Sequence, residues 1–147
     1  PADDPRRRQE ERACNRKLSV LTVRHISTGS PFEAQIGYSR AVVADGWVFV
    51  AGTSGYDYAT MTMPEDIEAQ CQNTLDTIAK VLEEAGSGLD HVVRVNYIVP
   101  DVAEWPKCWP STSAAFAKAR PAATMISAQL QNPEKKIEIE ETARIPD

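Results

Sequence analysis

Cysteine and histidine are scarce in this chain of 147 residues, which contains three cysteines and two histidines. Cys14, Cys71 and Cys108 are odd in number, widely separated and without C-x-x-C spacing, so they indicate neither a disulfide framework nor a zinc site. His25 and His91 lie far apart in the sequence and offer few ligands for a metal centre. We therefore expect reduced thiols, no metal and no cofactor.

Long apolar runs and an excess of basic charge are also absent. No run approaches the roughly 18 residues of a membrane span, and no basic-then-apolar leader resembles a signal peptide. The formal net charge of −5 and the pI near 5.1 provide no basic field for binding phosphates. We expect a soluble, cytoplasmic protein without a membrane partner, and nucleic-acid binding is disfavoured.

The first 19 residues contain little that a fold could bury. They include six Lys or Arg and four Asp or Glu, but Leu18 is their one large aliphatic residue. Such a segment cannot offset its ordering entropy, so residues 1–19 are expected to form a mobile arm. The basic run at 6–8 could contact nucleic acid or serve in targeting, although the flanking acids favour a solvated tail. Residues 20–147, in a chain that is 42% apolar, are expected to form one domain.

Four strands are predicted before the C-terminal part of the chain. β-Branched and aromatic runs place them at Val20–His25, Tyr38–Val43, Trp47–Ala51 and Val92–Val99. Asp45-Gly46 between the second and third runs is a hairpin signal, and Ser27–Phe32 is expected to be a loop.

Two helical segments interrupt the strands. Apolar residues at steps of three and four predict an amphipathic helix over Pro64–Ala85, with Thr62 as its N-cap and Pro64 in its first turn. The segment Val102–Lys118 is broken by prolines, so a short turn followed by a helix that starts near Pro110 is expected.

The C-terminal stretch contains two more β-type runs, Ala122–Gln129 and Lys135–Thr142, and we expect them to form a β-hairpin. Asn132-Pro133 marks a turn between them. Residues alternate between faces of a strand, so the isoleucines of I-E-I-E (137–140) should point one way and the glutamates the other. A half-exposed strand with its glutamates in water is the ordinary interpretation. The order of elements predicts an α+β domain, a mixed sheet with two helices on one face.

Several segments carry a family resemblance. They are I-G-Y-S-R-A (36–41), D-G-W-V-F-V-A-G-T (45–53), D-I-E-A-Q (66–70), A-G-S-G-L-D-H-V-V-R-V (85–95) and R-P-A-A-T with K-I-E-I-E (120–140). In order and spacing they resemble the RidA/YjgF family of reactive enamine and imine deaminases, some of whose members were called L-PSP endoribonucleases or translation inhibitors. The resemblance spans roughly residues 22–144. It implies a chorismate-mutase-like fold and a homotrimer with ligand clefts between subunits.

The resemblance also implies site residues. The family's water-activating glutamate falls on Glu138, and its tyrosine falls on Tyr38. A backbone site of the family falls on Gly52 and Thr53, although Gly52 is also explained as an ordinary strand-end glycine. The arginine that binds the substrate carboxylate in the family falls on Ala123, which has no charge.

A substitute for the missing arginine is not obvious from the sequence. Arg120 lies three residues before Ala123, and an odd separation along a strand predicts the opposite face. Arg40 lies two residues from Tyr38, so we expect it on the same face and consider it as a substitute cation. The more common alternative for Arg40 is an exposed hairpin arginine.

Two further positions differ from the family pattern. Met125 replaces a small polar residue or cysteine, and Trp109 falls near a family asparagine. Trp109 could fill the core at a strand-to-helix corner, or it could line a pocket. The cleft is therefore expected to be more apolar and less cationic than that of an archetypal member.

Three functions stay open at this point. The first is an enamine or imine deaminase whose substrate choice is altered by Ala123. The second is a non-catalytic trimeric protein that binds a small molecule or has a regulatory role. The third is an endoribonuclease, for which the acidic balance and the absence of a histidine pair give little physical basis.

Overall fold

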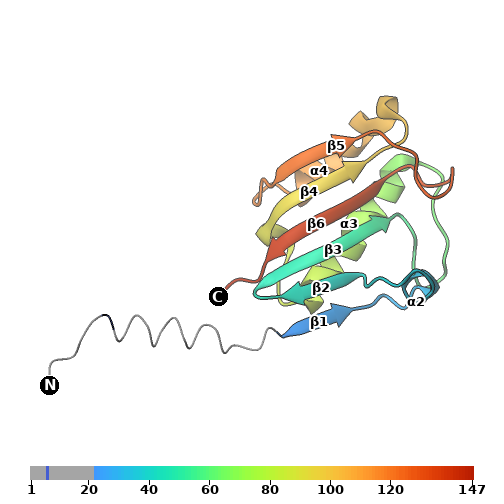
Figure 1. Cartoon of the computed structure of the whole chain (residues 1–147). Coiled ribbons are helices and arrows are strands. Elements are labelled where there is room, and N and C mark those ends of the chain that lie inside the picture. The colour runs from blue at the N-terminus through green and yellow to red at the C-terminus, as the bar shows by residue number, and fades with distance from the viewer. Residues whose placement is uncertain (1–5, 7–21) are drawn as a thin grey trace, which may run out of the picture.

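The described part of the chain folds around a mixed sheet whose strands lie in the order β1-β2-β3-β6-β4-β5 (Figure 1). The computed structural model describes residue 6 and residues 22–147. The strands are β1 (Val23–Ile26), β2 (Ala41–Ala44), β3 (Trp47–Ser54), β4 (Val92–Ile98), β5 (Ala122–Ile126) and β6 (Glu138–Arg144). β4 and β5 are parallel, whereas the other neighbouring strands are antiparallel. The arm predicted for residues 1–19 and the start of the first predicted strand lie outside the described residues, apart from residue 6.

The helices cover one face of this sheet, as predicted. Figure 1 shows α3 (Ile67–Glu84) and α4 (Trp109–Ala115) on the same side, with the opposite face of the sheet uncovered. Two 3₁₀ segments, η1 (Leu89–His91) and η2 (Val102–Cys108), lead into β4 and α4. None of the helices in the described residues is long and apolar enough to cross a membrane.

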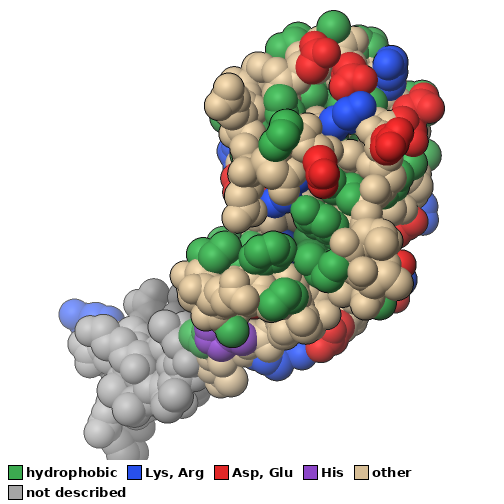
Figure 2. Space-filling model, turned by 90° about the vertical axis from the view of Figure 1, so that its right-hand side faces the viewer, with side chains coloured by type: hydrophobic (Ala, Val, Ile, Leu, Met, Phe, Trp, Pro, Cys, Tyr) green, Lys and Arg blue, Asp and Glu red, His purple; other side chains and the backbone are tan. Residues whose placement is uncertain are grey.

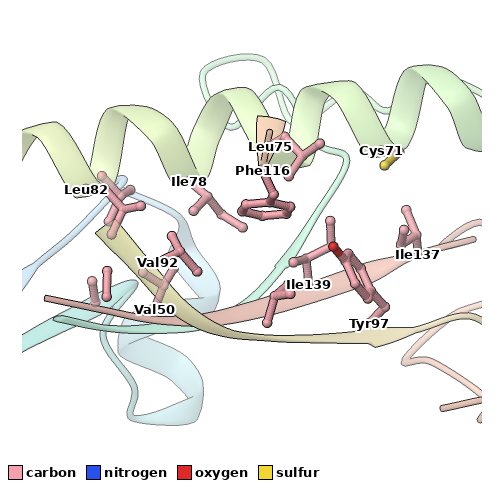
Figure 3. Close-up of a cluster of buried hydrophobic side chains, with 14 of the residues drawn as sticks. Val50, Cys71, Leu75, Ile78, Leu82, Val92, Tyr97, Phe116, Ile137 and Ile139 are labelled. Carbon is pink, nitrogen blue, oxygen red and sulfur yellow. The ribbon is translucent and has the colours of Figure 1, made fainter. Parts of the chain in front are cut away.

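The core lies between α3 and the sheet. Figure 3 shows the apolar stripe of α3 facing side chains of β3, β4 and β6 and the ring of Phe116. The stripe consists of Ile67, Cys71, Leu75, Ile78 and Leu82, each at most 1% exposed. The prediction of Thr62 as N-cap and Pro64 in the first turn was wrong. Asp66 caps the helix instead, because its carboxylate accepts a hydrogen bond from the backbone N–H of Ala69 at 3.0 Å.

The predicted C-terminal hairpin was also wrong. β5 pairs only with β4, in parallel, while β6 lies between β3 and β4. The turn at Asn132 is real, because its side-chain oxygen accepts hydrogen bonds from the backbone N–H groups of Glu134 and Lys135. The connection from residue 127 to 137 is long enough to carry the chain past β4. β6 thereby gains a hydrogen-bonded partner along both edges and buries Ile139 completely.

One helix was missed. The segment expected to be a loop at Ser27–Phe32 leads into α2 (Pro31–Ile36), which Ser30 caps at its start. Gly37, with φ of 91°, ends this helix in the left-handed conformation that glycine adopts readily. The second strand therefore begins at Ala41 rather than Tyr38, and Tyr38 lies in the connection between α2 and β2.

Candidate active site

Glu138 is the carboxylate at the centre of the candidate site. The predicted alternation of I-E-I-E is confirmed, because Ile137 and Ile139 are fully buried while Glu138 points to the face without helices. The hydroxyl of Ser54 donates a hydrogen bond to Oε2 of Glu138 at 3.3 Å, and Nζ of Lys135 lies 3.9 Å from the same oxygen. The side chain of Glu138 is 24% exposed, so the carboxylate is shielded but can be reached by a ligand.

Gly52 lies directly against this carboxylate. The ladder between β3 and β6 shifts its register between Val50 and Thr53, and Gly52 lies within that irregularity. A Cβ atom at position 52 would overlap Oε1 of Glu138. The backbone of β3 can therefore approach the carboxylate only because residue 52 has no side chain.

The loop before Glu138 is held by a buried glutamine of α3. The side chain of Gln70 is fully buried and donates to the carbonyl oxygens of Pro64 and Glu134, at 2.8 and 2.9 Å. Its side-chain oxygen accepts from the backbone N–H of Lys136 at 2.9 Å. These hydrogen bonds place the chain two residues before Glu138 at a fixed position on the helix.

Arg40 lies near this carboxylate and is buried, and both of its terminal nitrogens donate hydrogen bonds. It is only 1% exposed, so the alternative of an exposed hairpin arginine was wrong. Its Nη1 donates to the carbonyl oxygen of Gly52 at 2.7 Å and to the hydroxyl of Thr53 at 3.1 Å. Its Nη2 donates to the Tyr38 hydroxyl oxygen at 3.1 Å. Arg40 therefore holds the walls of the site. Its Nε has no hydrogen-bond partner among the described residues, but the guanidinium is buried and not open to a substrate in this protomer.

Two tyrosines lie over the guanidinium of Arg40. The ring centroids of Tyr38 and Tyr58 are 5.4 and 4.9 Å from its central carbon. Burial raises the pKa of Tyr58, whose hydroxyl oxygen accepts from the backbone N–H of Ser54. Because Arg40 donates to the Tyr38 oxygen, the hydroxyl proton of Tyr38 is free to donate to a ligand. Nothing in the sequence pattern indicated Tyr58, which comes from an irregular loop.

Glu33 fixes the backbone of Arg40. Its carboxylate accepts from the N–H and hydroxyl of Thr28, at 3.1 and 2.9 Å, and from the backbone N–H of Arg40 at 3.2 Å. Burial by itself raises the pKa of Glu33, but the hydrogen bonds from Thr28 and Arg40 outweigh it and leave the pKa below its usual value. The missed helix α2 thus anchors Arg40, which directly precedes β2.

The other predicted residues lie in a different part of the protomer. Trp109 and Ala123 line a cavity together with Val95 and Tyr97, on the side of the sheet covered by helices. Met125 pairs with Tyr97 and packs against the core on the same side. The structure therefore does not bring Trp109, Ala123 and Met125 together with Glu138 within one protomer.

Strand register gives the separation between the two groups. Glu138 pairs with Ile98 of β4, whereas Ala123 pairs with Val95 of the same strand. The offset is three residues along the strands and two strands across the sheet, about 10 Å in each direction. The two side chains also point to opposite faces of the sheet.

The prediction that Arg120 lies on the opposite side from Ala123 was wrong. Arg120 precedes β5 and has φ of 45°, so strand alternation does not extend to it. Arg120 and Ala123 line the same cavity.

Residues that could bind a metal are not clustered. In the part of the chain that the structure describes, no group of three or more His, Cys, Asp or Glu side chains could hold a metal ion. Cys71 and Cys108 are both free and buried. The groups that contact the Glu138 carboxylate are a hydroxyl and an ammonium, which suit a small polar ligand and a water molecule.

Comparison with known proteins agrees with this fold. A family model described as endoribonuclease L-PSP matches residues 28–145. A RutC family protein of Pyrococcus abyssi is 30% identical over 107 residues, which cover 72% of this chain and 84% of that protein. Rv2704 of Mycobacterium tuberculosis, a member of the YjgF/YER057c/UK114 family, has a crystal structure that is 36% identical with a TM-score of 0.76. That match covers 84% of this chain and 99% of the other.

A further crystal structure is less similar in sequence, so its similarity supports the fold of this chain but not a function. RidA from a Psychrobacter species is 24% identical, with a TM-score of 0.71, over 82% of this chain and 94% of the other. The fold and the site thus define a small α+β protein with a shielded carboxylate beside a buried arginine. The chain belongs to the RidA/YjgF family, which the endoribonuclease L-PSP model describes.

Proposed function

We propose that this protein hydrolyses the C=N bond of reactive enamines or imines and releases ammonia. The observation that carries the proposal is the carboxylate of Glu138, shielded but reachable, set against the backbone of Gly52. Beside it, Arg40 links Gly52 to the hydroxyl of Tyr38. The addition of water to an electrophilic carbon requires a base that accepts a proton from the water and a donor that positions the substrate. Glu138 and the Tyr38 hydroxyl can fill these two roles.

The proposed reaction uses only water and the imine. The oxygen of a bound water molecule attacks the imine carbon while Glu138 accepts one of its protons. A proton returns to the nitrogen as the C–N bond of the resulting carbinolamine breaks, and the products are a carbonyl compound and ammonia. Tyr38 orients the substrate by donating its free hydroxyl proton. Arg40 fixes Tyr38 and is therefore a positioning residue.

We further propose that the complete site forms between subunits of a homotrimer. Glu138 and Ala123 belong to one ligand site in the family but lie on opposite faces of the sheet in this protomer. Exposed apolar side chains support an association between copies, since Phe49 on the open face is 48% exposed and Ile126 on the edge strand is 52% exposed. Figure 2, which views the α2 side of the molecule, shows further hydrophobic side chains gathered on the surface.

Replacement of the proposed base tests the function. The imine would be generated in the assay from an amino acid by an amino-acid oxidase, and free ammonia would be followed as it is released. We expect Glu138→Gln to slow this release by at least about a hundredfold, because the amide cannot accept the water proton. Glu140→Gln is the matched control, since Glu140 is the next glutamate on the same face and its exposed carboxylate accepts from Asn96. Equal rates for wild type and Glu138→Gln would refute the proposal.

Further measurements distinguish the proposed hydrolysis from a purely binding function. The loss of the family arginine at Ala123 favours a binding protein as the second candidate. Saturable stabilisation by an imine or keto acid in a thermal-shift assay, with no acceleration of ammonia release by wild type, would establish that candidate instead. RNA cleavage that survives further purification and is lost in Glu138→Ala would point to an endoribonuclease.

A further inference from the structure

The cavity beside Ala123 has one charged group in an otherwise apolar and hydroxyl lining. It measures about 930 Å³, and its walls include Val95, Tyr97 and Phe116 from the core side. Trp109 lines the cavity and is 53% exposed, which is unusual for so large an apolar side chain. Among the described residues that line the cavity, Arg120 is the only charged one.

Arg120 has no counter-charge of its own. No carboxylate in the described part of the chain lies within ion-pair distance of its guanidinium. By contrast, nearby Lys118 lies 3.4 Å from a carboxylate oxygen of Asp90. An exposed, unpaired arginine at an apolar cavity is electrostatically complementary to an anionic ligand with an apolar body.

The backbone at Arg120 is held in a strained conformation. Its φ of 45° is left-handed, which costs energy for a residue with a side chain, and the following Pro121 normally forces an extended conformation on its predecessor. The backbone N–H of Arg120 donates to the carbonyl of Phe116 at 3.0 Å, which holds the turn after α4 in place. Backbone strain of this kind is more frequent at ligand sites than elsewhere, and the surrounding structure must hold the residue in place.

We infer that Arg120 supplies the cation for the carboxylate of a small acid with an apolar or aromatic side chain, which is bound in this cavity against Trp109. Ala123 leaves free the volume that an arginine would fill at that position. The substrate class is then a 2-imino acid with a bulky apolar side chain rather than a very small one. This inference rests on the proposed function in that it takes the ligand to be the imine hydrolysed at Glu138.

Arg40 does not fit this role. Both of its terminal nitrogens already donate to protein oxygens, and 1% of its surface is exposed. Its Nε has no hydrogen-bond partner among the described residues but is buried, so a ligand carboxylate could reach the guanidinium only if the residues that cover it moved.

Equilibrium binding tests the inference without turnover. The probes are 3-phenylpropanoate and its neutral amide, titrated into the full-length protein by calorimetry. We expect wild type to prefer the acid over the amide by about tenfold, since one charge-assisted contact at an exposed arginine separates the two ligands. Arg120→Gln keeps most of the side-chain length but removes the charge, and it should bind acid and amide equally.

Three variants provide the controls. Arg120→Lys should retain part of the preference for the acid, and Lys118→Gln should retain all of it. Glu140→Gln should bind the acid as wild type does. Because the readout is binding and not turnover, a failure of the proposed hydrolysis leaves this result intact. An acid preference that persists in Arg120→Gln, or no preference in wild type, would overturn the inference.

Discussion

At the scale of single residues, Glu141 has unfavourable surroundings. The alternation of faces along the strand turns its carboxylate toward the apolar core. It follows Ile137 and Ile139 on the core side of β6 and is 3% exposed. Neither of its carboxylate oxygens has a hydrogen-bond partner among the described residues, and burial raises the pKa of Glu141 to about 8. An ionised carboxylate there would be unpaired, so the folded protein keeps the neutral form below that pH.

This proton makes the stability of the fold depend on pH. Between about pH 4.5, the usual value, and about pH 8, folded Glu141 holds a proton that the unfolded chain releases. The free energy of unfolding should therefore fall as the pH rises through this window, by roughly a few kcal/mol in total. Urea unfolding at fixed protein concentration from pH 5 to pH 8 measures it.

A neutral replacement provides the comparison for this prediction. Glu141→Gln should remove most of the pH dependence and should be more stable than wild type at pH 8. The contributions of all other groups are present in both proteins and cancel in the difference. The same pH slope in both proteins would show that Glu141 is not the group responsible.

The residue scale also shows where a sequence pattern reaches its limit. Strand alternation predicted the face to which Glu138 points, and the family resemblance alone singled it out as a site residue. The engagement of Arg40 could not be predicted, because its partners Gly52 and Thr53 come from another strand and its position depends on Glu33 in an unpredicted helix. Arg120 was assigned to the wrong side because a left-handed φ before proline has no signature in the sequence.

At the scale of elements, the long helix was predictable and the strand order was not. The stripe on α3 repeats over several turns and defines its buried face locally. The position of β6 between β3 and β4 depends on pairing between segments far apart in the chain, which local patterns do not encode. Two adjacent β-type runs looked like a hairpin because such neighbours commonly pair.

The contact between α3 and the loop before β6 yields a prediction at this scale. Gln70→Ala removes three hydrogen bonds and leaves the part-buried N–H of Lys136 without its partner. We expect a loss of about 2–4 kcal/mol in the free energy of unfolding. Activity should also fall, because the loop sets the position of Glu138.

A second glutamine of the same helix is the matched control. Gln72 is exposed and its side chain contacts only Asp76 on the helix surface. Gln72→Ala should change the stability by no more than about 0.5 kcal/mol. Alanine has a higher helix propensity than glutamine, so propensity cannot cause a loss in either variant. Comparable losses in both would mean that the hydrogen bonds of Gln70 to the loop are not what stabilises the fold.

At the scale of the whole molecule, the two groups of site residues explain why one protomer is not expected to suffice. The group around Glu138 opens on the uncovered face of the sheet, and the cavity with Arg120 lies on the helix side. A symmetric oligomer can bring the first group of one copy to the second group of the next, because each interface repeats around the axis.

The trimer predicts both a mass and a pattern of complementation. Light scattering at low micromolar concentration should give about three times 16.2 kDa, and a monomer mass would refute the assembly. Glu138→Gln and Arg120→Gln should each be impaired alone when assayed at low substrate concentration. After the two variants are unfolded together and refolded in equal amounts, about a quarter of the clefts in random trimers would pair an intact Glu138 with an intact Arg120 of the neighbouring copy. Activity should then exceed that of either variant refolded alone. No gain on mixing, with exchange of subunits shown by mass spectrometry, would mean that the site is not shared between copies.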